Sequence, residues 1–351
     1  MNFKPKSDYI VFVGRFQPFH SGHRAIVEEA LDNANTVIIA VGSYRTSLDS
    51  KNPWTFEERK DMILCSLGHG VLPKESMDRV IIAPLRDYTY SDTTWISSLQ
   101  NIVASIVDDS TVQLIGHFKD DSSVYLTFFP QWPLLKQPNY RGINGTDIRA
   151  NYFDPDKHPR TFDNDVPIGM SLWMKAWRES NPDRYDNITQ ENSFLEVYNA
   201  RWKGTPFPVN FVTADAVVVQ SGHILMVRRG INPGKGKLAL PGGFVGTNET
   251  IFDASVRELY EETKIGISKK LLRRAFVADK VFDHPKRSQR GRIITHAHLF
   301  ELSQGGPLPS VKGSDDAFEA LWIPFNDIGL QEQEIFSDHI HIINYFINLG
   351  R

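Results

Sequence analysis

Tyr9-Ile-Val-Phe-Val-Gly14 and Thr36-Val-Ile-Ile-Ala-Val-Gly42 are two continuous apolar runs that each end in glycine, and they decide the fold of the first half of the chain. The residues between them, from about 22 to 33, have the length of one helix. Apolar runs of this length around a helical stretch are typical of buried parallel strands. The sequence therefore predicts a β-α-β unit.

The same alternation continues after this unit. Strand-like runs at 79–83 and 111–115 follow helix-length stretches at about 55–67 and 93–107. This order predicts an α/β domain with a parallel sheet covered by helices, and its ligands are expected at the carboxyl ends of the strands.

The second half of the chain has a different pattern. Residues 211–219 and 223–228 flank the turn Ser221-Gly222 and predict a hairpin, and strands at 292–302 and 320–323 alternate irregularly with helices at about 250–263 and 337–349. This mixture is typical of an α+β domain. The boundary is expected around 185–205, in a polar stretch that Lys203-Gly-Thr-Pro-Phe-Pro208 brings to an end. We therefore predict a first domain over 1–188, a linker over 189–205 and a second domain over 206–351.

The composition excludes several classes of protein. The 351 residues carry a net charge of −3 and include one cysteine, Cys65, so an intramolecular disulfide and a multi-cysteine metal site are both excluded. No charge run favours nucleic acid, and no apolar run approaches the roughly 18 residues of a membrane span. We expect a cytoplasmic protein with small-molecule ligands and no nucleic-acid or membrane partner, which could form a homo-oligomer.

The stretch from Gly14 to His23 joins the end of a strand to the start of a helix, a place where backbone N–H groups bind anions. His20 and His23 are three residues apart, so both imidazoles can face the same ligand. By themselves two such histidines could equally be half of a metal site or a solvated pair. The string Arg15-Phe-Gln-Pro-Phe-His-Ser-Gly-His23 resembles the His-x-Gly-His nucleotidyltransferases, and among them the archaeal-type nicotinamide mononucleotide (NMN) adenylyltransferases.

A second segment, Asn144-Gly-Thr-Asp-Ile-Arg149, resembles another element of that family, although it could be an ordinary turn and helix. We expect Thr146 to cap this helix. The resemblance implies a Rossmann-like domain that makes NAD and pyrophosphate from ATP and NMN with Mg²⁺ or Mn²⁺, and His20, His23 and Arg149 as catalytic residues at the phosphates. It also implies that Trp95 stacks on nicotinamide, unless it is a core residue, and that Arg59 contacts a phosphate. The full set implied for substrate binding is Gly14, Arg15, Phe16, Gln17, Arg59, Trp95, His117, Lys119, Asn144 and Thr146.

In the second domain, Thr250 and Asp253 predict a capping box, so a helix should begin at Ile251. That helix would place Glu258, Glu261 and Glu262 on one face, where their mutual repulsion is offset if Mg²⁺ or Mn²⁺ binds between them. Alternatively, the three glutamates form a solvated face that is tied to Arg257.

The spacing from Gly243 through Glu249 to Arg257 and the glutamates resembles the Nudix box, with Lys264 in place of the final glycine. The resemblance implies an α+β Nudix domain with a mixed-sheet sandwich, in which Glu258, Glu261 and Glu262 act as catalytic metal ligands. Glu249 would support the loop or reach a metal through water, and Arg257 would orient a glutamate. The basic loop that follows resembles the one in fused adenylyltransferase–Nudix proteins, which implies ADP-ribose as the substrate and Arg287, Arg290 and Arg292 as its ligands, unless the loop is simply solvated.

The two resemblances together imply a bifunctional enzyme of NAD metabolism. The first domain would synthesise NAD, and the second would hydrolyse ADP-ribose to AMP and ribose 5-phosphate, with Asp315, Asp316 or Glu319 as a candidate base. Three alternatives remain. The first domain could accept nicotinate mononucleotide, the second could cleave another nucleoside diphosphate derivative, or the second could be a sensor that binds ADP-ribose or NAD without hydrolysis.

Overall fold

The computed structural model describes residues 7–68, 70, 72–118, 121–157 and 163–348. The chain divides into two compact units, Met1–Gln190 and Glu191–Arg351, and each is described by itself. The division falls inside helix α7 (Pro182–Ala200). Residues 189–200 of the stretch expected to be a linker, 189–205, are therefore helical.

The N-terminal unit is built on a five-stranded sheet with the order β3-β2-β1-β4-β5, in which every neighbouring pair is parallel. This confirms the α/β prediction, and β5 is a strand that the sequence pattern did not reveal. The strands are β1 (Ser7–Gly14), β2 (Ala34–Val41), β3 (Val80–Pro84), β4 (Val112–Gly116) and β5 (Leu134–Lys136). The helices are α1 (Ser21–Asn33), α2 (Phe56–Gly68), α3 (Lys74–Met77), α4 (Asp92–Ala104), the 3₁₀ helix η1 (Asp121–Thr127), α5 (Gly145–Tyr152) and α6 (Ile168–Ser180).

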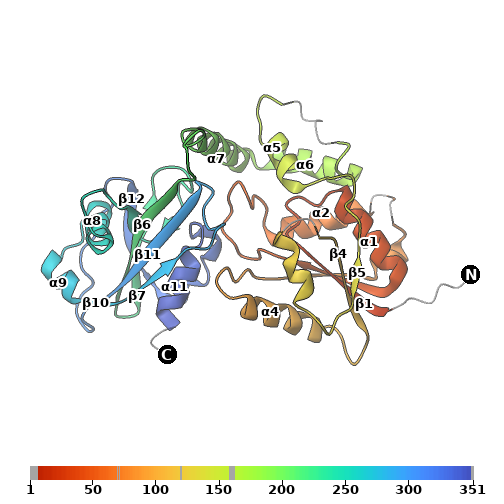
Figure 1. Cartoon of the computed structure of the whole chain (residues 1–351), viewed down its shortest axis with the longest axis horizontal. Coiled ribbons are helices and arrows are strands. Elements are labelled where there is room, and N and C mark those ends of the chain that lie inside the picture. The colour runs from red at the N-terminus through yellow and green to blue at the C-terminus, as the bar shows by residue number, and fades with distance from the viewer. Residues whose placement is uncertain (1–6, 69, 71, 119–120, 158–162, 349–351) are drawn as a thin grey trace, which may run out of the picture. The chain divides into compact units, whose positions relative to one another are not determined.

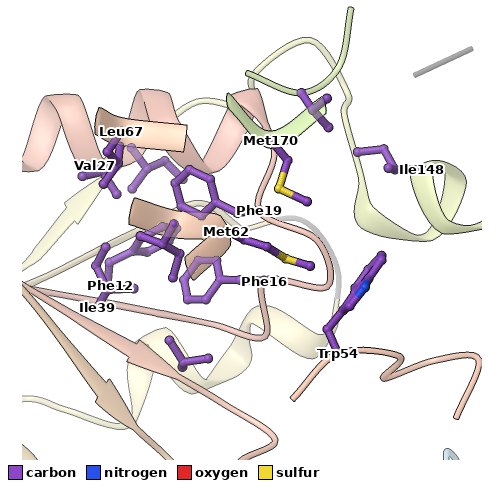
Figure 2. Packing of buried hydrophobic residues seen from close by; sticks show 14 of the residues in the cluster. Phe12, Phe16, Phe19, Val27, Ile39, Trp54, Met62, Leu67, Ile148 and Met170 are labelled. Carbon is purple, nitrogen blue, oxygen red and sulfur yellow. The ribbon is translucent and has the colours of Figure 1, made fainter. Parts of the chain in front are cut away.

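Alternate residues of these strands face opposite layers of helices. Ile10 and Phe12 pack with α1, α2 and α6, whereas Val11 and Val13 pack with Leu99 and Val103 of α4. Figure 1 shows α1 and α2 on one side of the sheet and α4 on the other. Figure 2 shows the first of these cores, where Phe16 and Phe19 lie beside Met62. The loop that follows β1 is thus anchored by its own aromatic side chains.

The C-terminal unit has a mixed seven-stranded sheet with the main order β10-β11-β6-β7-β12. β11 is parallel to β6, and the other neighbours along this path are antiparallel. The strands are β6 (Asn210–Gln220), β7 (His223–Arg229), β8 (Leu238–Ala239), β9 (Gly242–Phe244), β10 (Phe276–Phe282), β11 (Arg292–Glu301) and β12 (Ala317–Pro324). The helices are α8 (Ile251–Thr263), α9 (Lys269–Arg274), α10 (Phe325–Ile328), the 3₁₀ helix η2 (Glu332–Glu334) and α11 (His339–Asn348).

The predicted hairpin is confirmed at the start of this sheet. Ser221 and Gly222 both have positive φ, 47° and 73°, which is the conformation of a two-residue type I′ turn between antiparallel strands. One face of the sheet packs on α8 through Val256 and Leu259, and the other packs on α11. The unit is therefore a sandwich with a helix layer on each side, as Figure 1 shows for α8 and α11.

Across the described part of the chain, no helix is both long enough and apolar enough to cross a membrane.

Candidate functional sites

A cavity of about 180 Å³ lies at the carboxyl ends of β1 and β4 in the N-terminal unit. It brings together the two sequence segments that were expected to act on one ligand. Its lining includes Arg15, Phe16, Gln17, His20, Gly22, His23, His117, Asn144, Thr146 and Arg149. The position agrees with the rule that open parallel sheets bind ligands beyond the ends of adjacent strands.

The two histidines of this cavity lie one above the other. Their ring centroids are 3.6 Å apart and the rings are inclined by 22°. The backbone N–H of His20 donates to Nδ1 of His23 at 3.3 Å, so in the neutral imidazole the proton of His23 resides on Nε2. His23 can therefore donate one hydrogen bond to a ligand in the cavity.

Arg149 is held at the same cavity by helix α5. Its guanidinium donates to the carbonyl of Gln17 and to Oγ1 of Thr146, and burial together with the charge of Arg15 lowers its pKa to about 10. The helix is capped by Asn144, whose side chain accepts from the N–H of Asp147 at 3.0 Å. The expectation that Thr146 caps the helix is wrong, because the helix begins two residues earlier than such a cap would require, and the Thr146 side chain contacts Arg149 instead.

Arg59 lies outside the cavity lining, in the protein interior. It is 1% exposed, and burial lowers its pKa to about 10. Its guanidinium donates to four backbone carbonyls, those of Arg15, Gly42, Ser43 and Thr55. These bonds tie the end of β1 to the end of β2. The expected phosphate contact by Arg59 is therefore not supported, since the structure gives this arginine a scaffolding position.

Trp95 also lies away from the cavity lining. Its ring packs edge-on against Tyr125, with centroids 5.7 Å apart, and tilted against Phe129 at 6.0 Å. Trp95 is thus partly buried against the core that contains Phe129, and its stacking on nicotinamide stays a prediction. His117 is part of the lining, and Lys119 lies outside the described residues.

The glutamates of the C-terminal unit lie on α8. The helix begins at Ile251, as predicted, and Thr250 caps it by accepting from the N–H of Asp253 at 3.1 Å. Glu261 is half exposed, whereas Glu258 and Glu262 are largely buried. The three side chains thus differ in exposure along the same helix.

Arg257 links the acidic residues of the box to one another. Its guanidinium contacts Glu249 at 2.6 Å, Glu258 at 2.8 Å and Glu261 at 2.8 Å. Glu249 also accepts from the N–H of Gly246 at 2.7 Å, and its bonds to Arg257 hold its pKa below the ordinary value. In this geometry Glu249 supports the loop and Arg257 orients the two glutamates.

Glu262 is a buried carboxylate that no cationic side chain contacts directly among the described residues. Its Oε2 accepts from the N–H of Gly242 at 3.0 Å, yet burial raises its pKa to about 8. Burial also raises the pKa of Glu258. Within the described ranges no three His, Cys, Asp or Glu side chains lie close enough together to hold a metal ion. Carboxylate oxygens are nevertheless the ligands that Mg²⁺ and Mn²⁺ prefer, and in this structure the carboxylates of Glu258 and Glu261 are paired with Arg257.

Two backbone positions of the box, Gly243 and Lys264, have distinct structural roles. A Cβ on Gly243 would lie 2.5 Å from Oε1 of Glu258, so only glycine allows this approach. Lys264 ends α8 in the left-handed conformation, with φ 44° and ψ 38°. Lys264 thus ends the helix at the position where the box has its final glycine. It does so in a left-handed conformation that residues with a side chain disfavour.

The three arginines of the basic loop have different environments. Arg287 forms a buried ion pair with Asp338, and Arg292 pairs with Asp283 near the surface. Arg290 lies with its guanidinium carbon 5.3 Å from the ring centre of Phe244, and its Nε is buried with no hydrogen-bond partner among the described residues. Of the three expected ligands, Arg290 is the one that forms no ion pair among the described residues.

Sequence reasoning overlooked Asp215 and Phe244. Asp215 is 5% exposed, accepts a hydrogen bond from Oγ1 of Thr295, and contributes to the raised pKa of Glu262. It is the only carboxylate in the apolar run 211–219, which was the available signal. Among the candidate bases, Asp315 is the one whose charge makes a small contribution to the raised pKa of Glu258, which is mainly due to burial.

Two family models match the chain. The cytidylyltransferase-like family matches residues 11–151, and the NUDIX domain matches residues 209–346. Each match lies within one of the two units, and each contains one of the two candidate sites.

Relatives and solved structures were found for each half and for the whole chain. A nicotinamide/nicotinic acid mononucleotide adenylyltransferase of Acinetobacter baylyi is 34% identical over 50% of this chain and 89% of the relative. An ADP-ribose pyrophosphatase of Methanocaldococcus jannaschii is 33% identical over 39% of this chain and 72% of the relative. The crystal structure of a bifunctional NMN adenylyltransferase/ADP ribose pyrophosphatase from Francisella tularensis superposes with a TM-score of 0.90 at 36% identity, covering 97% of this chain and 99% of that one. A structure of the Francisella tularensis bifunctional protein with AMP and a Mn ion superposes with a TM-score of 0.89 at 35% identity, covering 98% and 100% of the two chains.

Proposed function

Since this chain belongs to the family of bifunctional NMN adenylyltransferases and ADP-ribose pyrophosphatases, we propose that it catalyses both reactions, one in each unit. The N-terminal unit transfers AMP from ATP to NMN, giving NAD and pyrophosphate. The C-terminal unit hydrolyses ADP-ribose to AMP and ribose 5-phosphate. The observation that carries the proposal is the correspondence over 97% of the chain with one bifunctional protein, at 36% identity.

In the N-terminal unit, the cavity supplies positioning and positive charge for adenylyl transfer. The phosphate of NMN attacks the α-phosphorus of ATP in line, and pyrophosphate leaves. His20, His23 and Arg149 line the cavity and would donate hydrogen bonds to the phosphate oxygens on which charge develops. A phosphate nucleophile is already ionised near neutral pH, so no general base is required. The chemistry therefore depends on orientation and charge neutralisation.

In the C-terminal unit, water attacks a phosphorus of ADP-ribose and the diphosphate bond breaks. Glu258, Glu261 and Glu262 would hold the divalent cation, with Arg257 keeping Glu258 and Glu261 in place. In both units the cation, Mg²⁺ or Mn²⁺, supplies charge neutralisation at the phosphates, and in this unit it also lowers the pKa of the attacking water. Arg290 would pair with the diphosphate, and Asp315 is the candidate base.

The experiment is product analysis by chromatography of the purified full-length protein. With ADP-ribose and Mg²⁺ we expect AMP and ribose 5-phosphate, and with ATP and NMN we expect NAD and pyrophosphate. Replacing NMN by nicotinate mononucleotide tests the preference of the first unit. ADP-ribose that is recovered intact, although it binds, would contradict hydrolysis and indicate a sensor domain or another diphosphate substrate.

A single substitution links the hydrolysis to α8. Glu261→Gln removes one carboxylate charge from a half-exposed position, so the fold should be retained. We expect ADP-ribose hydrolysis to fall by about 100-fold or more while NAD synthesis by the same preparation is unchanged. The matched control is Glu301→Gln, an exposed glutamate at the end of β11, which should leave both rates unaltered.

We also propose a cytoplasmic location. The ground is the single cysteine, which is compatible with a reducing compartment.

A further inference from the structure

Positive charge is concentrated around helix α9 of the C-terminal unit, in a region that neither proposed site uses. Residues 264–274 contain five basic side chains and no acidic one, a net charge of +5 in a chain whose net charge is −3. Figure 1 shows α9 and the start of β10 at one end of this unit. The charge of the chain is therefore distributed unevenly, although its total is close to zero.

The basic side chains of this region face solvent. The exposed ones, which we call the basic patch, are Lys264, Lys269, Lys270, Arg273, Arg274 and Lys312. Lys312 joins the patch from a distant segment, because its backbone N–H donates to the carbonyl of Thr263 at 2.8 Å, next to Lys264. Among the described residues, Arg273 is the one member of the patch that has an ion pair, with Asp253. The charge of the other members is therefore not neutralised within the unit.

The stability of α9 does not account for these cations. Lys269 and Arg273 are four residues apart on the helix, as are Lys270 and Arg274, and like charges at this spacing repel each other. The two arginines stand in the last turn, where the helix dipole favours cations. The two lysines stand in the first turn, where the dipole favours acidic side chains, and that turn has none. An external anionic surface would relieve both kinds of repulsion.

Apolar side chains are exposed among the cations. Leu271 of α9 is 50% exposed, and Phe276 and Val277 at the start of β10 are 38% and 54% exposed. Phe276 packs edge-on against Phe252 with ring centroids 5.3 Å apart, and the guanidinium carbon of Arg273 lies 5.4 Å from the centre of the same Phe252 ring. The apolar and basic side chains thus belong to one continuous surface. Surfaces of this composition bind anionic bilayers, where cations meet the headgroups and apolar side chains enter the interface.

We propose that the basic patch and these three apolar side chains bind the surface of an anionic phospholipid bilayer. The cations pair with the phosphate-bearing headgroups, and Leu271, Phe276 and Val277 enter the boundary between headgroups and acyl chains. A nucleic acid would attract the same cations, but it offers no apolar phase to Leu271 and Val277. The bilayer is therefore the partner that uses both the charged and the apolar part of the surface.

This proposal agrees with a cytoplasmic location, because the cytoplasmic leaflet of a membrane carries a negative surface potential. It departs from the expectation that the chain has no membrane partner. That expectation considered long runs of one charge and apolar spans, whereas the patch alternates basic and apolar residues and takes Lys312 from a distant segment.

The test is sedimentation of the full-length protein with vesicles made of equal parts phosphatidylglycerol and phosphatidylcholine, compared with vesicles of phosphatidylcholine alone. We expect binding to the mixed vesicles only, strong at about 0.1 M salt and largely lost at about 0.5 M. Each cation near an anionic bilayer strengthens binding by about five-fold, so Lys270→Gln combined with Arg274→Gln should weaken it by about 25-fold. Leu271→Gln keeps the helix propensity but removes an apolar side chain, and it should weaken binding by about five-fold.

The matched control is Arg201→Gln combined with Lys203→Gln, which removes the same charge from exposed positions outside the patch and should leave vesicle binding unchanged. The melting temperature of each variant verifies that it is folded. The proposal is overturned if the wild-type protein binds neither kind of vesicle or both equally, or if the two double variants bind alike. It is also overturned if the wild-type protein binds polyuridylate more tightly than the mixed vesicles and Leu271→Gln alters neither affinity, since the patch would then recognise nucleic acid.

Discussion

Arg287 and Asp338 form a two-bond salt bridge in the interior of the C-terminal unit. Nε and Nη2 of the arginine each donate to one carboxylate oxygen at 2.8 Å, and the two side chains are 6% and 5% exposed. The pair fastens the basic loop to the residue that precedes α11. It also leaves Arg287 little capacity to bind substrate, although the sequence makes this arginine as good a candidate as Arg290.

The first prediction concerns this pair. Asp338→Asn leaves a buried guanidinium without its counter-charge, so we expect the free energy of unfolding to fall by about 3–5 kcal/mol. KM for ADP-ribose, measured on the folded protein, should change little. Urea denaturation and steady-state kinetics check the two parts. Arg292→Met is the control, because its more exposed contact with Asp283 should contribute less than about 1 kcal/mol.

The second prediction separates the two roles considered for Arg59. Arg59→Met deletes the bonds to four carbonyls and leaves those acceptors buried, so we expect a loss of about 3 kcal/mol or more in stability. The melting temperature of the N-terminal unit reports this loss. Lys60→Met removes the same charge from the same helix and should have a small effect. A variant of normal stability whose KM for ATP is raised would instead identify Arg59 as a phosphate ligand.

The third prediction uses the two ring nitrogens of His23. His23→Asn can still accept the hydrogen bond from the His20 N–H but lacks a donor at the Nε2 position, whereas His23→Gln retains a donor there. We expect NAD synthesis to fall by about 100-fold to 1,000-fold in the asparagine variant and by less in the glutamine variant. ADP-ribose hydrolysis by the same samples is the internal control. Equal losses in the two variants would contradict the assignment of Nε2 as the donor.

The fourth prediction is a pH dependence of stability. His298 is 3% exposed, and burial lowers its pKa from 6.5 to about 4, with a smaller contribution from His296. The unfolded chain therefore binds a proton at a higher pH than the native protein does. The stability contributed by the neutral ring is fully present above pH 6.5 and is lost as the pH falls toward 4, by up to about 1.4 kcal/mol per pH unit.

Comparison with His298→Leu isolates this effect. The difference in unfolding free energy between the variant and the wild-type protein should be constant above pH 7 and should shift in favour of the variant by about 3 kcal/mol between pH 6.5 and pH 4. Urea titrations at a series of pH values measure it. A difference that does not vary with pH would show that His298 titrates normally.

The sequence predicted those features that depend on local pattern. The strand runs, the hairpin at Ser221 and Gly222, and the helix start at Ile251 each follow from neighbouring residues, and the structure confirms them. Lys264 shows the limit of this reasoning. The sequence shows that glycine is missing, but only the backbone shows that the lysine adopts the left-handed conformation in its place.

The features that could not be predicted depend on partners distant in sequence. The acceptors of Arg59 come from residues 15, 42 and 43 as well as from its own helix, so its burial is not visible in the local string. The sequence does not distinguish Arg287 from Arg290 as a substrate ligand, because it does not show that Asp338 lies beside Arg287. The ring contacts of Phe211 in β6 with Tyr198 of α7 and Phe244 of β9 combine three segments, and no single segment of the sequence suggests them.

The parallel pairing of β6 with β11 has a consequence for how the chain folds during synthesis. Asn210 pairs with Arg292 and Val219 pairs with Glu301, so the central strand β6 cannot complete its pairing until the distant strand β11 has been synthesised. In the first sheet, by contrast, the paired strands β1 and β2 are separated by one helix. Long-range pairing of this kind closes slowly. As the ribosome proceeds, the N-terminal sheet can be complete once residue 136 has emerged. The edge of β6 stays unpaired until β11 follows, and nascent chains are most exposed to aggregation during that interval.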